Sequence, residues 1–254
     1  MLSMSLVLIS SVVGATTQGG WSFGIHAGPF DPSISESSAV RDYYDLLFTS
    51  EENDYIYENR PMLVELEEQS LWDIGFGQAG VAVRFGTWSA RGKARICEDA
   101  DGSTTSCTSE TVVNSSPGNT RIRLMAYPLT LRGVYRFDLL ERNGWFPLEL
   151  QVHGGLNYTF WRSTAAGDVA TTTIDGSEVE ASGGTAGFEF GGALLLGLDF
   201  LDPATASRAI ATRGMVGSYL VLSYTFASAD GFGKPNKIHF SGNKVQLGLA
   251  IDFL

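Results

Sequence analysis

The sequence predicts an all-β fold: an eight-stranded antiparallel up-and-down transmembrane β-barrel with long extracellular loops and a short periplasmic helix. Three observations predict it. Apolar and polar residues alternate along eight segments, several segments are long enough to cross a bilayer as tilted strands, and long connections alternate with short ones. Because the strand number is even, both ends of the barrel domain are expected on the periplasmic side.

Each of the eight segments has apolar residues at every second position. Their approximate bounds are 21–28, 61–69, 76–89, 120–136, 147–161, 186–200, 215–228 and 245–254. In the fourth segment, the apolar row changes phase at Pro128. We expect a bulge there, because proline cannot donate a hydrogen bond to a neighbouring strand.

The connections follow the rhythm of a membrane barrel. Those expected outside the cell are 29–60, 90–119, 162–185 and 229–242. The periplasmic connection "DPATASRAIATRG" (202–214) is expected to hold a helix. Its Asp can cap the helix, its Pro suits the first helical position and its Gly suits the end.

The polar row of each strand is rich in Gly, Ala, Ser, Gln and Thr, which suits a narrow lumen better than a solvated exterior. Ionisable residues on this row are expected to pair across the lumen, because buried charges need partners. The candidates are Glu65, Glu67, Arg84, Arg132, Glu149, His153 and Glu189. A soluble barrel of the lipocalin type predicts a row rich in Lys and Glu, and a two-sheet sandwich does not explain the loop rhythm, so both alternatives are less favoured.

Aromatic residues are expected to form two belts at the membrane surfaces. The periplasmic set is Trp21, Trp72, Phe137, Trp145, Phe200 and Phe253. The outer set is Trp88, Tyr158, Phe160, Trp161, Phe188 and Phe226.

Composition and the amino-terminal segment bear on location and partners. The net charge of −11 argues against nucleic acid as a partner. Residues 1–15 are predicted to be a secretory signal cleaved after Ala15, the alternative being a buried first strand, and residues 16–254 a single barrel domain. Cys97 and Cys107 lie in a polar loop and are expected to form a local disulfide in an exported protein. No cofactor, metal ion or catalytic residue is predicted.

The final stretch "VQLGLAIDFL" resembles the carboxy-terminal β-signal of bacterial outer-membrane proteins, which the barrel-assembly machinery reads. The residues that carry this resemblance are Val245, Leu247, Leu249, Ile251 and Phe253. Here the aromatic residue is penultimate, because Leu254 follows it.

Four further stretches resemble a poorly characterised family of outer-membrane β-barrels from myxobacteria and related delta-proteobacteria. They are "GIHAGPFDPSI" (24–34), "LVELEEQSLWDIGFGQAGVAV" (63–83), "YPLTLRGVYRFD" (127–138) and "FLDPATASR" (200–208). The resemblance implies a bacterial outer-membrane location and the barrel fold, and it implies no particular chemistry.

We therefore expect a structural, anchoring or surface-interaction role through the extracellular loops. A diffusion pore is not expected, because side chains fill so narrow a barrel. We expect a monomer in contact with outer-membrane lipid and lipopolysaccharide, and the sequence does not indicate which partner the loops bind. One alternative is a lipid-modifying hydrolase or acyltransferase, in which His26, His153 or His239 meets Ser and an acid at one rim. Another is a binder or transporter of small apolar ligands, which requires a cavity in the lumen.

Overall fold

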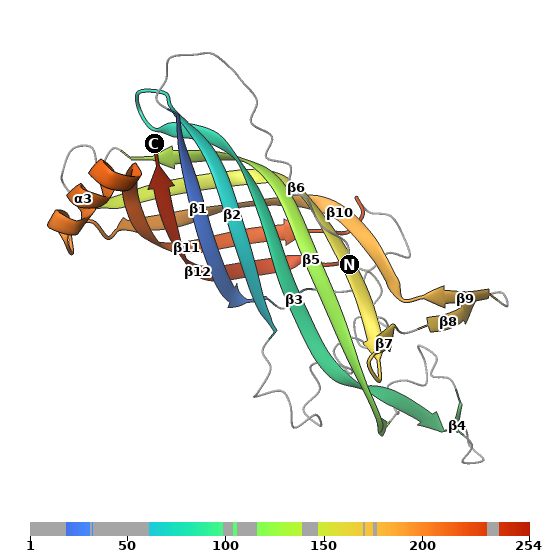
Figure 1. Ribbon diagram of the computed structural model, residues 1–254. Coiled ribbons are helices and arrows are strands. Elements are labelled where there is room, and N and C mark those ends of the chain that lie inside the picture. The colour runs from blue at the N-terminus through green and yellow to red at the C-terminus, as the bar shows by residue number, and fades with distance from the viewer. Residues whose placement is uncertain are drawn as a thin grey trace.

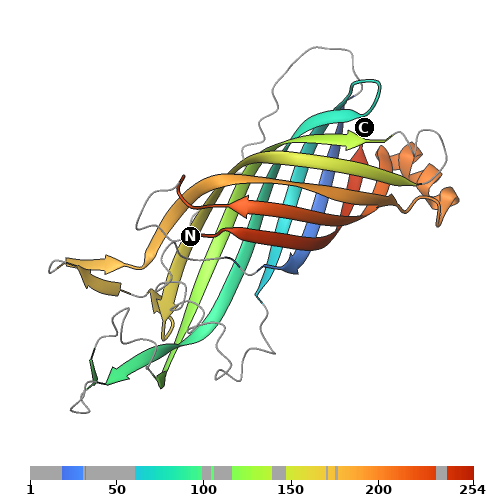
Figure 2. The ribbon, with the colours of Figure 1, turned by 180° about the vertical axis from the view of Figure 1, so that it is seen from behind.

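The computed structural model of the chain describes residues 19–30, 32, 61–98, 104–105, 116–138, 147–169, 171–174, 177–232 and 239–254. Eight long strands in these residues form one closed antiparallel barrel, as predicted (Figures 1 and 2). They are β1 (Gly19–Pro29), β2 (Met62–Asp73), β3 (Gln78–Glu98), β5 (Ser116–Phe137), β6 (Leu148–Ala165), β10 (Ser182–Gly197), β11 (Met215–Ser228) and β12 (Gly242–Phe253).

Two pairings complete the barrel, one between its first and last strands and one between the successive long strands β6 and β10. The last strand, β12, pairs with the first, so that Trp21 lies opposite Phe253 and Ala27 opposite Leu247. Strand β6 pairs with β10 along a ladder that begins at Leu148. Closure satisfies backbone groups that an open sheet would leave unpaired, which is a requirement for any sheet that crosses a bilayer.

The two faces of the barrel wall differ sharply in polarity. Large apolar side chains remain exposed on the outer face, among them Leu131 (59%), Leu156 (62%) and Leu247 (56%). The residues between them are mostly polar or small and point into the barrel, where many are buried. Glu68 of β2 is an acidic residue on the outer face, half-buried between Phe23 and Val83 of the neighbouring strands. The apolar row therefore points outward, as predicted.

The paired strands β3, β5, β6 and β10 extend beyond the barrel at the end opposite the carboxyl terminus (Figures 1 and 2). Strands β3 and β5 stay paired as far as Ile96 and Ser116. Four short strands add to this extension: β4 (Thr104–Thr105), β7 (Asp168–Val169), β8 (Thr171–Ile174) and β9 (Ser177–Glu180). The expectation that 90–119 and 162–185 are loops is therefore wrong for much of both segments. These two segments lack the alternation of apolar and polar residues by which the barrel strands were predicted, although their backbones remain paired.

The predicted bulge at Pro128 is also wrong. Phe85 lies opposite Leu129 and Trp88 opposite Ala126, so the register of β3 and β5 is the same on both sides of the proline. Leu124, Ala126 and Pro128 continue the inward row of β5. The apparent change of phase arises because the inward row itself becomes apolar, and the register shift lies further out, between Lys93 and Arg95.

The predicted helix is present as α3 (Pro203–Arg213). The side chain of Asp202 accepts a hydrogen bond of 3.0 Å from the backbone N–H of Thr205. This bond holds the pKa of Asp202 below its usual range, so the cap is present at neutral pH and lost when acid protonates the carboxylate. Gly214 ends the helix with a φ of 65°. Within the described part of the chain, no helix is long and apolar enough to span a membrane.

The aromatic belts are present in part. Trp21 and Trp72 are exposed near the end that carries α3, while Tyr158 and Phe160 are exposed toward the other end. Phe137, Phe188 and Phe200 are exposed as well, and Phe226 and Phe253 are half-buried. Trp145 lies outside the described residues.

Two tryptophans expected in the outer belt point into the lumen instead. Trp88 is 1% exposed, and Trp161 is partly buried against the same apolar cluster. Both occupy inward positions of their strands, so the alternation itself assigns them to the lumen.

The outward direction of the apolar row generates a first prediction. Leu222 lies in the middle of β11 and is 47% exposed. We expect Leu222→Arg to lower the free energy of unfolding by about 2–4 kcal/mol, because the charge would lie near the bilayer midplane. The measurement is a urea titration of the protein folded into phospholipid vesicles.

The control variant is Ile210→Arg on α3, which is exposed but lies outside the strands. It should change the stability by about 0.5 kcal/mol or less. Equal stability of Leu222→Arg and the unchanged protein would show that the apolar face does not contact lipid.

Candidate functional site: the filled lumen

Charged side chains from five strands meet in the middle of the barrel. All of them are buried, with exposures of 4% or less. They are Glu65 and Glu67 on β2, Arg84 on β3, Arg132 on β5, Glu189 on β10 and Lys244 on β12. Because each points inward from its own strand, the register of the barrel places all six in one cluster.

Glu67 is the acceptor shared by the most partners in this cluster. Arg84 donates from Nε at 2.8 Å and also from Nη2, and Arg132 donates from Nη2. The imidazole Nε2 of His26 lies 3.4 Å from the same carboxylate. Gly248 makes room for this ring, because a Cβ atom there would lie 2.5 Å from His26 Nδ1.

A second chain of contacts closes the cluster on the opposite wall. Arg84 Nη1 donates to Glu65 at 3.0 Å. Lys244 Nζ donates to Glu65 at 3.4 Å and to Glu189 at 3.1 Å, and Arg132 Nη1 lies 3.7 Å from Glu189. Three cationic groups therefore face three carboxylates, and the formal charges of the cluster cancel. Such balance is what the cost of burying charge requires.

Arg136 forms a second polar cluster nearer to the end that carries α3. Its guanidinium donates to Asp252 at 2.7 Å, and its Nη1 lies 4.0 Å from Glu149. Neutral partners complete its hydrogen bonds. These are Ser22 at 3.0 Å, Gln69 at 2.8 Å and Gln151 at 3.0 Å. Tyr219 donates to Glu149 at 3.4 Å.

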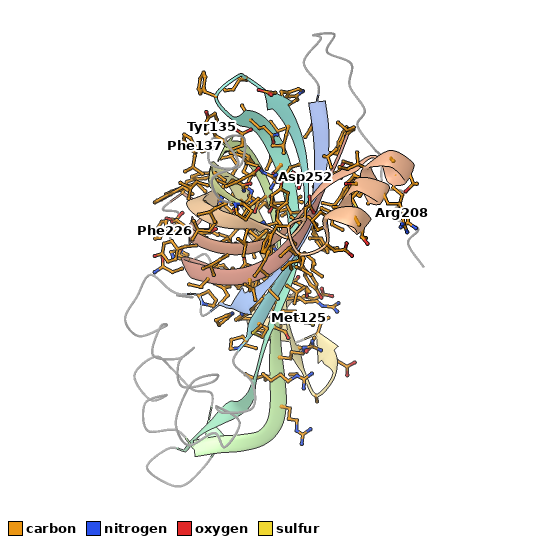
Figure 3. The ribbon with its side chains drawn as sticks, turned by 90° about the vertical axis from the view of Figure 1, so that its left-hand side faces the viewer. Met125, Tyr135, Phe137, Arg208, Phe226 and Asp252 are labelled. Carbon is orange, nitrogen blue, oxygen red and sulfur yellow. The ribbon has the colours of Figure 1, made fainter. Side chains whose placement is uncertain are left out.

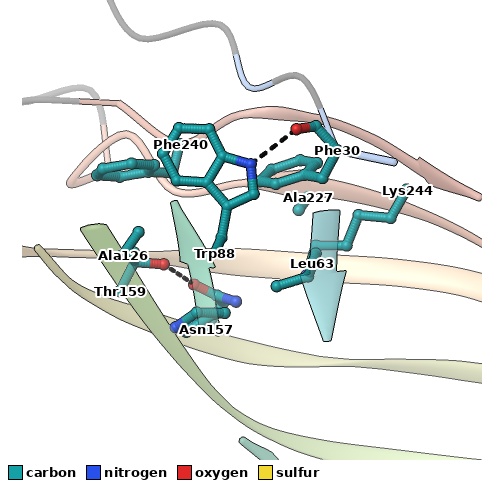
Figure 4. Close-up of a pocket in the computed structure, with 10 residues that line it drawn as sticks. Phe30, Leu63, Trp88, Ala126, Asn157, Thr159, Ala227, Phe240 and Lys244 are labelled. Atoms are coloured by element: carbon teal, nitrogen blue, oxygen red, sulfur yellow. Dashed lines mark hydrogen bonds between the residues drawn. The ribbon is translucent and has the colours of Figure 1, made fainter. Parts of the chain in front are cut away.

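An apolar cluster fills the lumen at the end that carries the extension (Figure 4). Trp88 stands between Phe30 and Phe240, with ring centroids 6.4 and 6.2 Å away, and donates from Nε1 to the carbonyl of Phe30 at 2.8 Å. The other buried members are Leu63, Ala90, Leu124, Ala126 and Ala229. This cluster separates the charged groups from that end of the barrel.

Two very small cavities lie inside the lumen, among the described residues. One lies beneath Trp88, and another lies beside His26 and Arg136. Each has about 10 Å³ of space for the centre of a water molecule, enough for roughly one water. Ligand sites usually need a few hundred Å³, so neither cavity offers room for an apolar ligand. A larger pocket of about 170 Å³ lies outside the lumen, between α3 and the start of β11.

Two of the three histidines lie inside the barrel. His153 Nε2 lies 3.0 Å from the hydroxyl of Thr225, and both side chains are buried inside the barrel. His26 is also buried, with its Nε2 3.4 Å from the carboxylate of Glu67. His239 is buried just before β12. Within the described residues, no group of three potential metal ligands comes together.

The structure brings most of the predicted lumen residues into ionic contact. Glu65, Glu67, Arg84, Arg132 and Glu189 meet in the central cluster, and Glu149 lies beside Arg136. His153 bonds to a hydroxyl instead.

The prediction missed Lys244, Arg136 and Asp252. All three were detectable, because Lys244 and Asp252 share the inward alternation of Gln246, and Arg136 shares that of Arg132.

Several predicted features lie partly or wholly outside the described residues. The backbone of Cys97 pairs with Thr105, but its side chain and the whole of Cys107 are outside them, so the disulfide stays a prediction. Residues 1–15 are also outside. In the predicted assembly signal, Val245, Leu247 and Leu249 point outward, and Ile251 and Phe253 are half-buried.

No family model and no curated protein matches the chain. Among solved structures, it is similar to bacterial outer-membrane β-barrels. The N-terminal β-barrel domain of Pseudomonas aeruginosa OprF is 9% identical, with a TM-score of 0.37, over 93% of this chain and 98% of that one. Neisserial surface protein A is 10% identical, with a TM-score of 0.36, over 92% and 95%. A major outer membrane protein from Thermus thermophilus is 14% identical, with a TM-score of 0.46, over 92% and 99%.

The shared acceptor in the central cluster generates a second prediction. We expect Glu67→Gln to lower the free energy of unfolding by about 3–5 kcal/mol, because Arg84 and Arg132 would lose the carboxylate that compensates their buried charge. Glu68→Gln is the matched control, since it removes the same charge one residue away on the outer face. It should leave the stability unchanged or raise it. Urea titrations in vesicles measure both variants, and equal effects would contradict the assigned faces.

Proposed function

We propose that the protein is an outer-membrane β-barrel that anchors a surface-exposed sheet extension and is closed to diffusion. One observation carries the proposal: large apolar side chains cover the outside of the barrel, while ion pairs and an apolar cluster fill its inside. The exterior suits hydrocarbon, and a lumen filled by side chains is not expected to conduct water or ions. The role that follows is structural, anchoring or interactive, through the part of the chain outside the membrane.

The proposed orientation places α3 and both termini of the barrel domain in the periplasm. The turn at Ile74–Gly77 and α3 lie at the end of the barrel that holds the carboxyl terminus, and the extension lies at the other end (Figure 1). Short connections on the periplasmic side and long ones outside are the usual pattern of such barrels. We also propose that the assembly machinery reads the terminal strand and that the barrel inserts as a monomer.

Membrane insertion of a filled barrel generates a third prediction. The protein should remain in the membrane fraction after extraction with alkaline urea, and its mobility on gels should shift on heating. In planar bilayers it should show no stable open channel, because its lumen is filled. Release by urea without a heat-dependent shift would overturn membrane insertion, and steady conductance would overturn closure.

Orientation generates a fourth prediction, measured by labelling intact cells with a membrane-impermeant maleimide. In a background with Cys97→Ser and Cys107→Ser, Ala166→Cys should be labelled, because the turn between β6 and β7 would face the medium. Ala209→Cys on α3 should be labelled only after the outer membrane is permeabilised. The reverse pattern would invert the orientation.

In the unchanged protein, both native cysteines should react with an alkylating reagent only after reduction.

A further inference from the structure

Four exposed arginines lie together where the sheet leaves the barrel. They are Arg91 on β3, Arg121 and Arg123 on β5, and Arg162 on β6. Arg91 lies directly opposite Arg123 in the ladder of β3 and β5. Arg162 lies opposite Met125, two residues from Arg123 on the neighbouring strand. All four occupy outward positions of their strands, and Figure 3 shows nitrogen-tipped side chains along the extension beyond Met125.

This concentration of positive charge contrasts with the negative net charge of the chain. The protein has a net charge of −11, and like charges directly opposite each other destabilise a sheet. Among the residues that the structure describes, none forms an ion pair with these four arginines. The Nη2 of Arg123 donates to Ser89 at 3.4 Å, a neutral contact that does not compensate its charge. The described part of the chain therefore supplies no counter-charge to these arginines, an arrangement that suits the binding of an anion.

The position of the cluster indicates which anion. On the same face of β6, Arg162 is followed toward the barrel by Phe160 and then Tyr158, which are 51% and 40% exposed. On β5, Leu129 and Leu131 continue the apolar band below. The cationic groups thus lie directly beyond the aromatic level, where the phosphates of membrane lipids lie.

We propose that Arg91, Arg121, Arg123 and Arg162 bind the phosphate groups of the outer-leaflet glycolipid, the lipid A part of lipopolysaccharide, whose acyl chains would lie along the apolar band beneath. The inference rests on the proposed function, because it requires this end of the barrel to face the outer leaflet. Guanidinium groups suit the task, since each can donate two parallel hydrogen bonds to a phosphate. The Cβ atoms of Arg91 and Arg123 are about 5 Å apart across the ladder, close enough for both guanidinium groups to bind one phosphate.

The test uses the full chain in nanodiscs of zwitterionic lipid that contain a small fraction of lipid A. Native mass spectrometry counts the lipid A molecules bound to each barrel. The unchanged protein should retain lipid A with two phosphates roughly tenfold or more better than its dephosphorylated form, because each charge-assisted bond to phosphate is strong. Inorganic phosphate in large excess should not displace the lipid.

The double variant Arg91→Gln/Arg123→Gln should lose this preference. The matched control is Arg208→Gln/Arg213→Gln, which removes the same charge from exposed positions on α3 at the other end and should keep it. If the double variant does not fold, the single variant Arg162→Gln should weaken retention in the same direction.

Retention by Arg91→Gln/Arg123→Gln equal to that of the unchanged protein would overturn the proposal. So would equal retention of dephosphorylated lipid A, or displacement by inorganic phosphate, which would indicate a site for the free anion. A heat-dependent gel shift of each sample reports separately whether the barrel has inserted. Loss of lipid recognition is thereby distinguished from failure of the membrane-barrel proposal.

Discussion

The ion pairs of Glu67 with Arg84 and Arg132 are the interaction on which the arrangement of this barrel depends. Glu67 and Arg84 are direct partners in the ladder of β2 and β3, and Arg132 points inward from the next strand. A slip of one residue in either ladder would turn a whole row of side chains to the opposite face. It would move Glu67 or its partners into lipid and bring apolar residues into the lumen. The central cluster therefore fixes the register of three strands as well as neutralising their charges.

The lumen is divided along its axis into a charged zone and an apolar zone. In the charged zone, salt bridges such as that of Lys244 with Glu189 occupy the space that water would otherwise fill. In the apolar zone, Trp88 packs between Phe30 and Phe240 and shields the charges from the end that carries the extension. The apolar zone excludes water, which strengthens the ion pairs of the charged zone. The ion pairs in turn balance the buried charges, so that these charges need no water. The filled lumen is the physical basis of the proposed anchoring role.

The same division explains what the sequence could and could not predict. Alternation identified the eight strands, the closure of the last on the first, and the cluster around Glu67, because lipid outside and polar groups inside give adjacent residues opposite character. At Leu124 and Ala126 the inward row becomes apolar, so the rule that apolar residues face outward produced a false bulge at Pro128. Beyond residue 90 the alternation of apolar and polar residues ends, although β3 continues to Glu98. The alternation of apolar and polar residues reflects a difference between the surroundings of the two faces of the sheet. Strand pairing can therefore be predicted from this alternation only where the two surroundings differ.

The side chains on the outer face of the barrel change in character along a single strand. On β5 this face runs from Leu131 and Leu129, through the half-buried Tyr127, to Arg123. Strand β5 continues without interruption past all of these residues, because its backbone hydrogen bonds to β3 and β6 do not depend on what surrounds the outer face. Only the side chains change, from hydrocarbon-compatible to aromatic to cationic, in the order in which a bilayer presents acyl chains and phosphates. In the proposed orientation, this continuous sheet would fix the depth of the barrel in the membrane, and the arginines would set the level at which the extension leaves it.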